Sequence, residues 1–247
     1  MEDAEIMISV VIPAHNEAAN LPKLIEEVQE SLEGKLEYEI IVVDDASTDE
    51  TPHVLKQLFL SHQRLRCVRH SACCGQSASL MTGIDFAGGD VIGTLDGDGQ
   101  NDPGDLPQMV QLLRNGQSQG VAMIAGHRQR RQDNLMKRFS SWVANSVRSR
   151  LLRDGTPDSG CGIKVFTRTA FLRLPRFHHM HRFLPALIRR DGGQVVSAAV
   201  NHRPRVSGKS HYGTLDRLLA GIVDLCGVIW LMRRSRLVVL EKEYERT

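Results

Sequence analysis

The sequence predicts an α/β fold built on a mainly parallel sheet. Five apolar runs alternate with helical segments over the first 125 residues, the pattern typical of strand–helix–strand units. Residues 6–12 and 40–43 are apolar at almost every position, as expected of strands buried on both faces. Polar and acidic residues follow these strands, at the sheet edge where such folds bind ligands.

Helical spacing and end signals place the remaining elements. The first helix is predicted to open at Asn20 and to close at Gly34, because apolar residues recur every three or four positions between them. The other predicted helices span 50–60, 75–87, 103–114, 181–190 and 215–232, and the other strands span 65–68, 91–95, 121–125 and 195–200.

The net charge of +2 hides an asymmetry along the chain. Residues 1–60 hold fourteen acidic residues and three lysines, whereas residues 61–247 hold 28 basic and 15 acidic residues. A near-neutral total argues against a nucleic-acid or anionic-membrane partner, but this division makes a phosphate-bearing partner plausible again.

Two features point to a reduced, cytoplasmic compartment. The five cysteines form no CxxC pair, which also disfavours zinc, and the acidic first residues do not resemble a secretion signal.

Two segments have the composition of membrane-surface helices. Residues 126–153 carry eight basic residues and one acidic residue beside an apolar stripe, which suits either a membrane surface or a solvated helix packed on the core. The apolar stretch 218–232 is fifteen residues long and contains Asp224. It is shorter than the roughly 20 residues that a spanning helix needs, so an interfacial helix or a buried core helix is expected rather than a transmembrane one.

The strongest local signal for chemistry is Asp96-Gly-Asp98, directly after the strand at 91–95. Two carboxylates one residue apart on a turn can face one hard cation such as Mg²⁺. Acidic turns are common, but Asp44 and Asp45 follow a neighbouring predicted strand and strengthen the interpretation.

Residues 13–17, 42–49 and 96–100 together resemble the family-two glycosyltransferases. Residues 158–166 resemble the segment that follows the catalytic centre, and 205–213 resemble the R-x-x-G-x-S loop of the polyprenol-phosphate sugar synthases. The resemblance extends over about residues 6–232. It implies a GT-A fold and inverting transfer of a sugar from a UDP- or GDP-sugar to a polyprenyl phosphate, with Mg²⁺ or Mn²⁺.

The resemblance also implies roles for individual positions. The base and ribose pocket would use Pro13, His15, Glu17 and Asp45. The metal would be held by Asp96 and Asp98, with Gln100 beside them. The loop over the donor diphosphate would use Arg205, Lys209 and Ser210. The acceptor phosphate would be bound by Arg128, Lys137 or its neighbour Arg138, and Ser141. The sugar would be approached by His181 and Arg182.

A phosphate acceptor is largely ionised near pH 7, so the reaction needs cations that position the acceptor rather than a strong general base. Asp158 is predicted to orient the sugar or to act as a weak base, or instead to cap the turn before Ser159. The catalytic domain is expected at 1–213, with a nucleotide-sugar half at 1–126 and an acceptor half at 127–213 that includes a basic helix at 133–153. Residues 214–247 are expected to form an interfacial helix and tail.

Two other functions fit parts of the sequence. The same fold could act on a saccharide or protein hydroxyl, and a basic module could bind nucleic acid through residues 126–153. The acidic loops disfavour nucleic acid, so no such partner is expected, whereas a homo-oligomer and a peripheral position on the inner face of the membrane are. A hexose or a hexosamine fits, and the Arg and His residues around 176–205 also suit a hexuronic acid.

Overall fold

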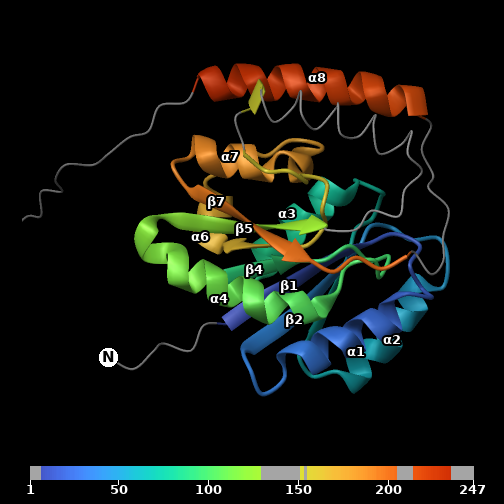
Figure 1. Ribbon diagram of the computed structural model, residues 1–247. Coiled ribbons are helices and arrows are strands. Elements are labelled where there is room, and N and C mark those ends of the chain that lie inside the picture. Colours follow the sequence, from blue (N-terminus) through green and yellow to red (C-terminus); the bar gives the residue numbers. More distant parts are fainter. Residues whose placement is uncertain (1–6, 129–150, 153–154, 205–213, 235–247) are drawn as a thin grey trace, which may run out of the picture.

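The computed structural model describes residues 7–128, 151–152, 155–204 and 214–234, and for 214–220 only the helical path. A seven-stranded sheet lies at the centre of the described part, with helices on both faces (Figure 1). The α/β prediction is therefore confirmed.

The strands occur in the order β3-β2-β1-β4-β6-β5-β7 across the sheet. All neighbouring pairs are parallel except those of β6, which is antiparallel to both β4 and β5. The strand bounds are β1 Met7–Ala14, β2 Glu37–Asp44, β3 Leu65–Arg69, β4 Val91–Thr94, β5 Val121–Arg128, β6 Lys164–Thr167 and β7 Gln194–Val200.

The helices form two layers. Residues of α1, α2 and α4 pack into one core cluster, and residues of α3, α6, α7 and α8 into a second. The bounds of the helices are α1 Leu21–Leu32, α2 Thr51–Ser61, α3 Gln76–Phe86, α4 Leu106–Gly116, α6 Arg168–Leu172, α7 Leu184–Arg190 and α8 Thr214–Arg233. The short 3-10 helices are η1 Pro103–Asp105, η2 Gln117–Gln119 and η3 Met180–Arg182.

Strand β1 supplies side chains to both cores. Ile8, Val10 and Ile12 belong to the first cluster, while Val11 belongs to the second. Side chains alternate between the two faces of a strand, so a strand covered on both faces must be apolar throughout. The apolar run near the start of the sequence is therefore explained by the burial of β1 on both of its faces.

Strand β6 is the main element that the sequence did not predict. It is four residues long and begins with Lys164, so neither its length nor its composition indicates a buried strand. It is held by ladders on both sides, because Ile92 of β4 and Met123 of β5 both pair with Phe166. Long-range pairing, rather than local propensity, therefore defines this strand.

Helix α8 lies along the outside of the second layer, next to α7 (Figure 1). Val228 is buried against that core, and the Arg190 Nε of α7 donates to the Leu231 carbonyl at 3.2 Å. Among the described helices, none has the length and hydrophobicity needed to cross a membrane.

Close packing between α3 and the sheet gives a stability prediction. A Cβ on Gly83 would overlap Cγ1 of buried Val11 and lie 3.3 Å from Cγ2 of Val43. We expect Gly83→Val to lower the free energy of unfolding by about 3 kcal/mol, because overpacked cores displace side chains and backbone. Gly227→Val on α8 is the control, because nothing lies within 4 Å of a Cβ at that position. Equal urea midpoints for the two variants would contradict this packing.

Candidate active site

Three loops meet at the carboxyl ends of β1, β2 and β4. The Asp45 amide donates to the Ala14 carbonyl at 2.8 Å, and the His15 ring Nδ1 lies 2.7 Å from the Asp45 carbonyl. A Cβ on Gly97 would lie 2.9 Å from the Pro13 carbonyl oxygen. The strand order reverses between β1 and β4, which is where open α/β sheets bind ligands.

The Asp45 carboxylate is buried and holds the turn before α3. Its oxygens accept the Cys74 amide at 2.8 Å, the Gly75 amide at 2.7 Å and a hydrogen bond with His70 Nδ1 at 2.8 Å. Burial alone would raise the pKa of Asp45, but these hydrogen bonds outweigh it and lower the pKa below the ordinary aspartate value. Asp45 is therefore a fixed negative charge at the predicted base and ribose pocket.

The other residues predicted for that pocket surround Asp45. The His15 side chain is exposed, so one face of its ring is available for stacking. The Glu17 carboxylate accepts the side-chain amide of Asn20 at 2.6 Å, and a Cβ on Gly97 would lie 3.4 Å from the Cγ of Glu17. The structure thus brings Pro13, His15, Glu17 and Asp45 to one edge of the sheet.

Asp96 is anchored from two sides. Its Oδ1 accepts the Gln76 side-chain amide at 2.8 Å, and its backbone N–H donates to Asn101 Oδ1 at 2.9 Å. Burial and the neighbouring Asp98 carboxylate raise the pKa of Asp96, while Lys164 and Arg128 act in the opposite direction. A cation bound between the two carboxylates would favour their ionised forms.

The residues at this turn fit a divalent cation. Asp96 and Asp98 offer only oxygen, the ligand that Mg²⁺ and Mn²⁺ prefer, and Mg²⁺ is commonly held by one or two carboxylates together with substrate phosphates and water. Gln100 is tied to the same turn, because its amide N–H donates to Asp98 Oδ1 at 3.2 Å and its side chain donates to the Arg203 carbonyl at 3.5 Å.

A glycine lets the segment before β6 pass directly against Asp96. A Cβ on Gly162 would overlap Asp96 Oδ2 and lie 2.7 Å from Asn101 Oδ1. The Thr94 hydroxyl donates to the Gly162 carbonyl at 2.7 Å and fixes this approach. Any larger residue here would displace the Asp96 carboxylate.

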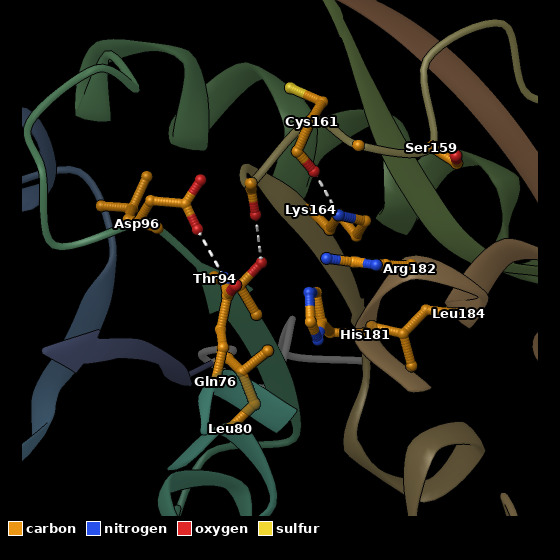
Figure 2. Close-up of a pocket in the computed structure, with 13 residues that line it drawn as sticks. Gln76, Leu80, Thr94, Asp96, Ser159, Cys161, Lys164, His181, Arg182 and Leu184 are labelled. Carbon is orange, nitrogen blue, oxygen red and sulfur yellow. Dashed lines mark hydrogen bonds between the residues drawn. The ribbon is translucent and has the colours of Figure 1, made fainter. Parts of the chain in front are cut away.

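A cavity of about 220 Å³ opens beside Asp96. Figure 2 shows Asp96 on one side of it and Lys164, His181 and Arg182 on the other. The cavity is smaller than the ~300–1,000 Å³ of typical small-molecule sites, which suits one sugar ring rather than a whole nucleotide sugar. The predicted sugar-side residues His181 and Arg182 and the predicted metal ligand Asp96 therefore line one space.

His181 is held as a neutral ring. Its Nδ1 lies 2.7 Å from the Ser77 hydroxyl, and its backbone N–H donates to the same oxygen at 3.2 Å. Burial lowers the pKa of His181 to about 3, and the charges of Lys164 and Arg182 act in the same direction. We assign the ring proton to Nε2, with the Ser77 hydroxyl donating to Nδ1.

Arg128 and Asp158 form a bidentate ion pair. Arg128 Nε donates to Asp158 Oδ2 at 2.6 Å and Nη2 donates to Oδ1 at 2.8 Å, with Asp158 almost fully buried. The pair raises the pKa of Arg128. A carboxylate that already accepts two N–H groups from one guanidinium is poorly placed to take a proton, so the geometry favours a positioning role for Asp158.

Several predicted residues lie outside the described part of the chain. This holds for Lys137, Arg138 and Ser141, for Arg205, Lys209 and Ser210, and for the basic helix at 133–153 except Leu151 and Leu152. Their roles stay predictions from the resemblance.

Two cavity residues were missed from sequence alone. Lys164 lies within the motif-like segment 158–166, but only its strand pairing reveals that it faces Asp96 across the cavity. Gln76 begins α3 and carries no motif signal, because its contact with Asp96 joins residues 20 positions apart.

Comparison with known proteins identifies the family. The family model described as glycosyl transferase family 2 matches residues 9–174. The chain belongs to this family. The predicted resemblance is confirmed, and the protein is a glycosyltransferase.

One curated relative of this glycosyltransferase is the dodecaprenyl-phosphate galacturonate synthase of Rhizobium johnstonii. The two are 34% identical over 231 residues, which cover 92% of this chain and 67% of the relative.

Solved structures support the GT-A fold of this glycosyltransferase. A mannosyltransferase from Pyrobaculum calidifontis, solved with GDP-Man and Mn²⁺, matches with a TM-score of 0.70 at 17% identity over 96% of this chain and 67% of that one. The glucosyl-3-phosphoglycerate synthase of Mycobacterium tuberculosis, solved with Mg²⁺ and UDP, matches with a TM-score of 0.63 at 18% identity over 90% and 80%.

The neutral state of His181 gives a pH prediction. The folded pKa of about 3 lies below the roughly 6.5 of an unfolded histidine, so between these values the unfolded chain binds a proton that the folded chain does not. The free energy of unfolding therefore decreases as the pH falls from 6.5 towards 3, so the folded protein becomes less stable. We expect His181→Gln to lose less stability than the wild type between pH 7 and pH 4 in urea titrations.

The matched control is His53→Gln at an exposed position of α2, which should follow the wild-type pH profile. Parallel profiles for the wild type and His181→Gln would contradict the neutral state of the partly buried His181.

Proposed function

We propose that this glycosyltransferase moves a hexose or hexuronic acid from a UDP- or GDP-sugar to a polyprenyl phosphate at a membrane surface, with inversion and with Mg²⁺ or Mn²⁺. The observation that carries the proposal is the carboxylate pair Asp96 and Asp98 at the β1–β4 switch point, beside a cavity of sugar size. The acceptor class is supported by the name of the Rhizobium johnstonii relative.

The donor half of the reaction follows from the loops after β1, β2 and β4. Asp45 and His15 would position the nucleoside, while Asp96 and Asp98 would hold the cation. That cation, when bound, neutralises the charge that develops on the departing nucleoside diphosphate. Gln76 and Asn101 keep Asp96 in place while the cavity beside it receives the sugar.

The acceptor half of the reaction needs positive charge rather than a base. A phosphate monoester is ionised near neutral pH and can attack the anomeric carbon without losing a proton to the enzyme. Arg128 is fixed by Asp158 and lies near Gly160, which lines the cavity. In this proposal Arg128 contributes to acceptor binding and Asp158 orients it.

Helix α8 supplies a surface suited to a membrane interface. Ile222, Val223 and Trp230 are 51%, 70% and 61% exposed, although Val228 on the same helix is buried. Arg233 and Arg234 follow, and the Arg234 guanidinium lies 5.9 Å from the centroid of the Trp230 ring. A helix that exposes apolar side chains, a tryptophan among them, next to terminal arginines is suited to an anionic membrane surface.

The proposed reaction is tested with radiolabelled UDP- and GDP-sugars, Mn²⁺, and either undecaprenyl phosphate or saccharide acceptors. We expect labelled lipid to form and Asp98→Asn to lower kcat/KM by about 100-fold or more, because loss of one charge-stabilising group costs on that order. Circular dichroism should show that the Asp98→Asn variant remains folded.

Asp90→Asn is the matched control, because Asp90 is an exposed aspartate next to the start of β4. Wild-type turnover in Asp98→Asn would overturn the metal assignment. Transfer to saccharides in preference to undecaprenyl phosphate would overturn the acceptor assignment.

Membrane attachment is tested by sedimentation with anionic vesicles. We expect the double substitution Val223→Ser and Trp230→Ser to lower the partition coefficient at least ~10-fold, because each apolar side chain contributes roughly 1.5–3 kcal/mol when buried. Phe59→Ser is the control, since Phe59 is 53% exposed and belongs to α2, a helix that lies far from α8 (Figure 1). If the double variant sediments like the wild type, α8 does not contact the membrane.

A further inference from the structure

The wall of the cavity opposite Asp96 carries two basic side chains. Among the residues that line the cavity, Asp96 is the carboxylate, whereas Lys164 and Arg182 are cations. The side chains of Lys164, Arg182 and His181 extend into the same part of the cavity from β6 and the η3 turn (Figure 2). Two cations and a ring N–H thus converge on a space of about 220 Å³.

The position of Lys164 is fixed by the sheet. It pairs with Thr94 on β4 and with Ala125 on β5, and its side chain is buried. Its Nζ donates to the Cys161 carbonyl oxygen. Burial lowers the pKa of Lys164, and the carboxylates of Asp96 and Asp158 oppose that effect.

The carboxylates of Asp96 and Asp158 each have another cation besides Lys164 to pair with. Asp158 is in the bidentate pair with Arg128, and Asp96 would bind the divalent cation of the proposed reaction. When the cation is present, the charge of Lys164 is left with less compensation from the protein. A buried charge without a counter-charge is costly, so the loaded site favours an anionic group near Lys164.

His181 adds a neutral donor to the same wall. With Nδ1 engaged by Ser77, the Nε2–H is the group that can donate to a ligand in the cavity. A carboxylate has two oxygens that accept several hydrogen bonds, and it suits a set of donors better than a hydroxymethyl group does.

We propose that Lys164, Arg182 and His181 form a carboxylate-binding subsite that selects a hexuronic acid as the transferred sugar. This inference rests on the proposed function, because it takes the cavity as the site of the donor sugar. The carboxyl carbon of a hexuronic acid is attached to C5, which shares the ring oxygen with the anomeric carbon. The anomeric carbon and the carboxyl carbon are therefore only three bonds apart, through the ring oxygen and C5, so one sugar ring can bring both into the cavity that Asp96 and the basic side chains line.

The competing assignment is that Lys164 and Arg182 bind a phosphate group of the donor. Every nucleotide sugar carries the diphosphate, so their loss would then weaken uronate and neutral donors equally. A carboxylate subsite instead affects only the donors that carry a carboxylate. The ratio of affinities for matched uronate and hexose donors separates the two assignments.

The experiment measures donor binding by isothermal titration calorimetry with Mn²⁺ and without acceptor. The donor pairs are UDP-galacturonate with UDP-galactose, UDP-glucuronate with UDP-glucose, and GDP-mannuronate with GDP-mannose, and UDP and GDP alone report on the diphosphate. We expect the wild type to bind a uronate at least ~30-fold more tightly than its neutral partner. Arg182→Gln and Lys164→Met should each weaken the preferred uronate at least ~10-fold and change the affinity of its neutral partner and of the nucleotide less than ~3-fold.

Arg173→Gln is the matched control, because Arg173 is an exposed arginine paired with Asp191 and does not line the cavity. It should keep the wild-type ratio. If Lys164→Met does not fold, Arg182→Gln alone decides the result. Equal affinity of the wild type for uronate and neutral donors, or equal losses on both in the variants, would overturn the subsite.

Binding and transfer are measured separately. Selective uronate binding without transfer to undecaprenyl phosphate would leave the subsite standing and contradict the proposed function. If neutral hexoses were transferred as efficiently as uronates, the proposed function would stand and the carboxylate subsite would be contradicted.

Discussion

The insertion of β6 between β4 and β5 is the constraint on which the site depends. It is antiparallel to both neighbours in an otherwise parallel sheet, and its register places Lys164 opposite Thr94, two residues before Asp96. Because side chains alternate along a strand, a slip of one residue would turn Lys164 to the other face. Gly162 makes this register possible, since it passes Asp96 where no Cβ fits. One short strand therefore places Lys164 across the cavity from Asp96.

The carboxylates of Asp45 and Asp96 lie in different environments on this edge of the sheet. Asp45 is surrounded by N–H donors from its own chain, which lower its pKa and fix its negative charge. Asp96 is partly buried beside Asp98, and desolvation and that neighbouring carboxylate raise its pKa. The first environment suits a permanent structural anion. The second suits a carboxylate whose ionised form is stabilised by a bound cation, as in metal-assisted transfer of a nucleotide-linked sugar.

The sequence predicted the features that depend on local pattern. The run at 6–12 corresponds to β1, which is buried on both faces, and the carboxylates of Asp96 and Asp98 lie after β4 as expected. It did not predict β6, because four residues that begin with lysine have no strand signal apart from their neighbours. The Arg128–Asp158 pair joins positions 30 residues apart, and Gln76 reaches Asp96 over 20. Such contacts follow from topology, which no local pattern encodes.

In the proposed reaction this edge of the sheet binds a metal–nucleotide complex on Asp96 and Asp98 and directs the sugar towards Lys164, Arg182 and His181. The most direct test is a crystal structure of the protein with Mn²⁺ and the uronate donor that binds most tightly. We predict an anomalous manganese peak at Asp96 and Asp98 and a sugar carboxylate within hydrogen-bonding distance of Lys164 Nζ or the Arg182 guanidinium. A manganese site elsewhere, or a sugar ring outside the cavity with its carboxylate in solvent, would contradict this arrangement.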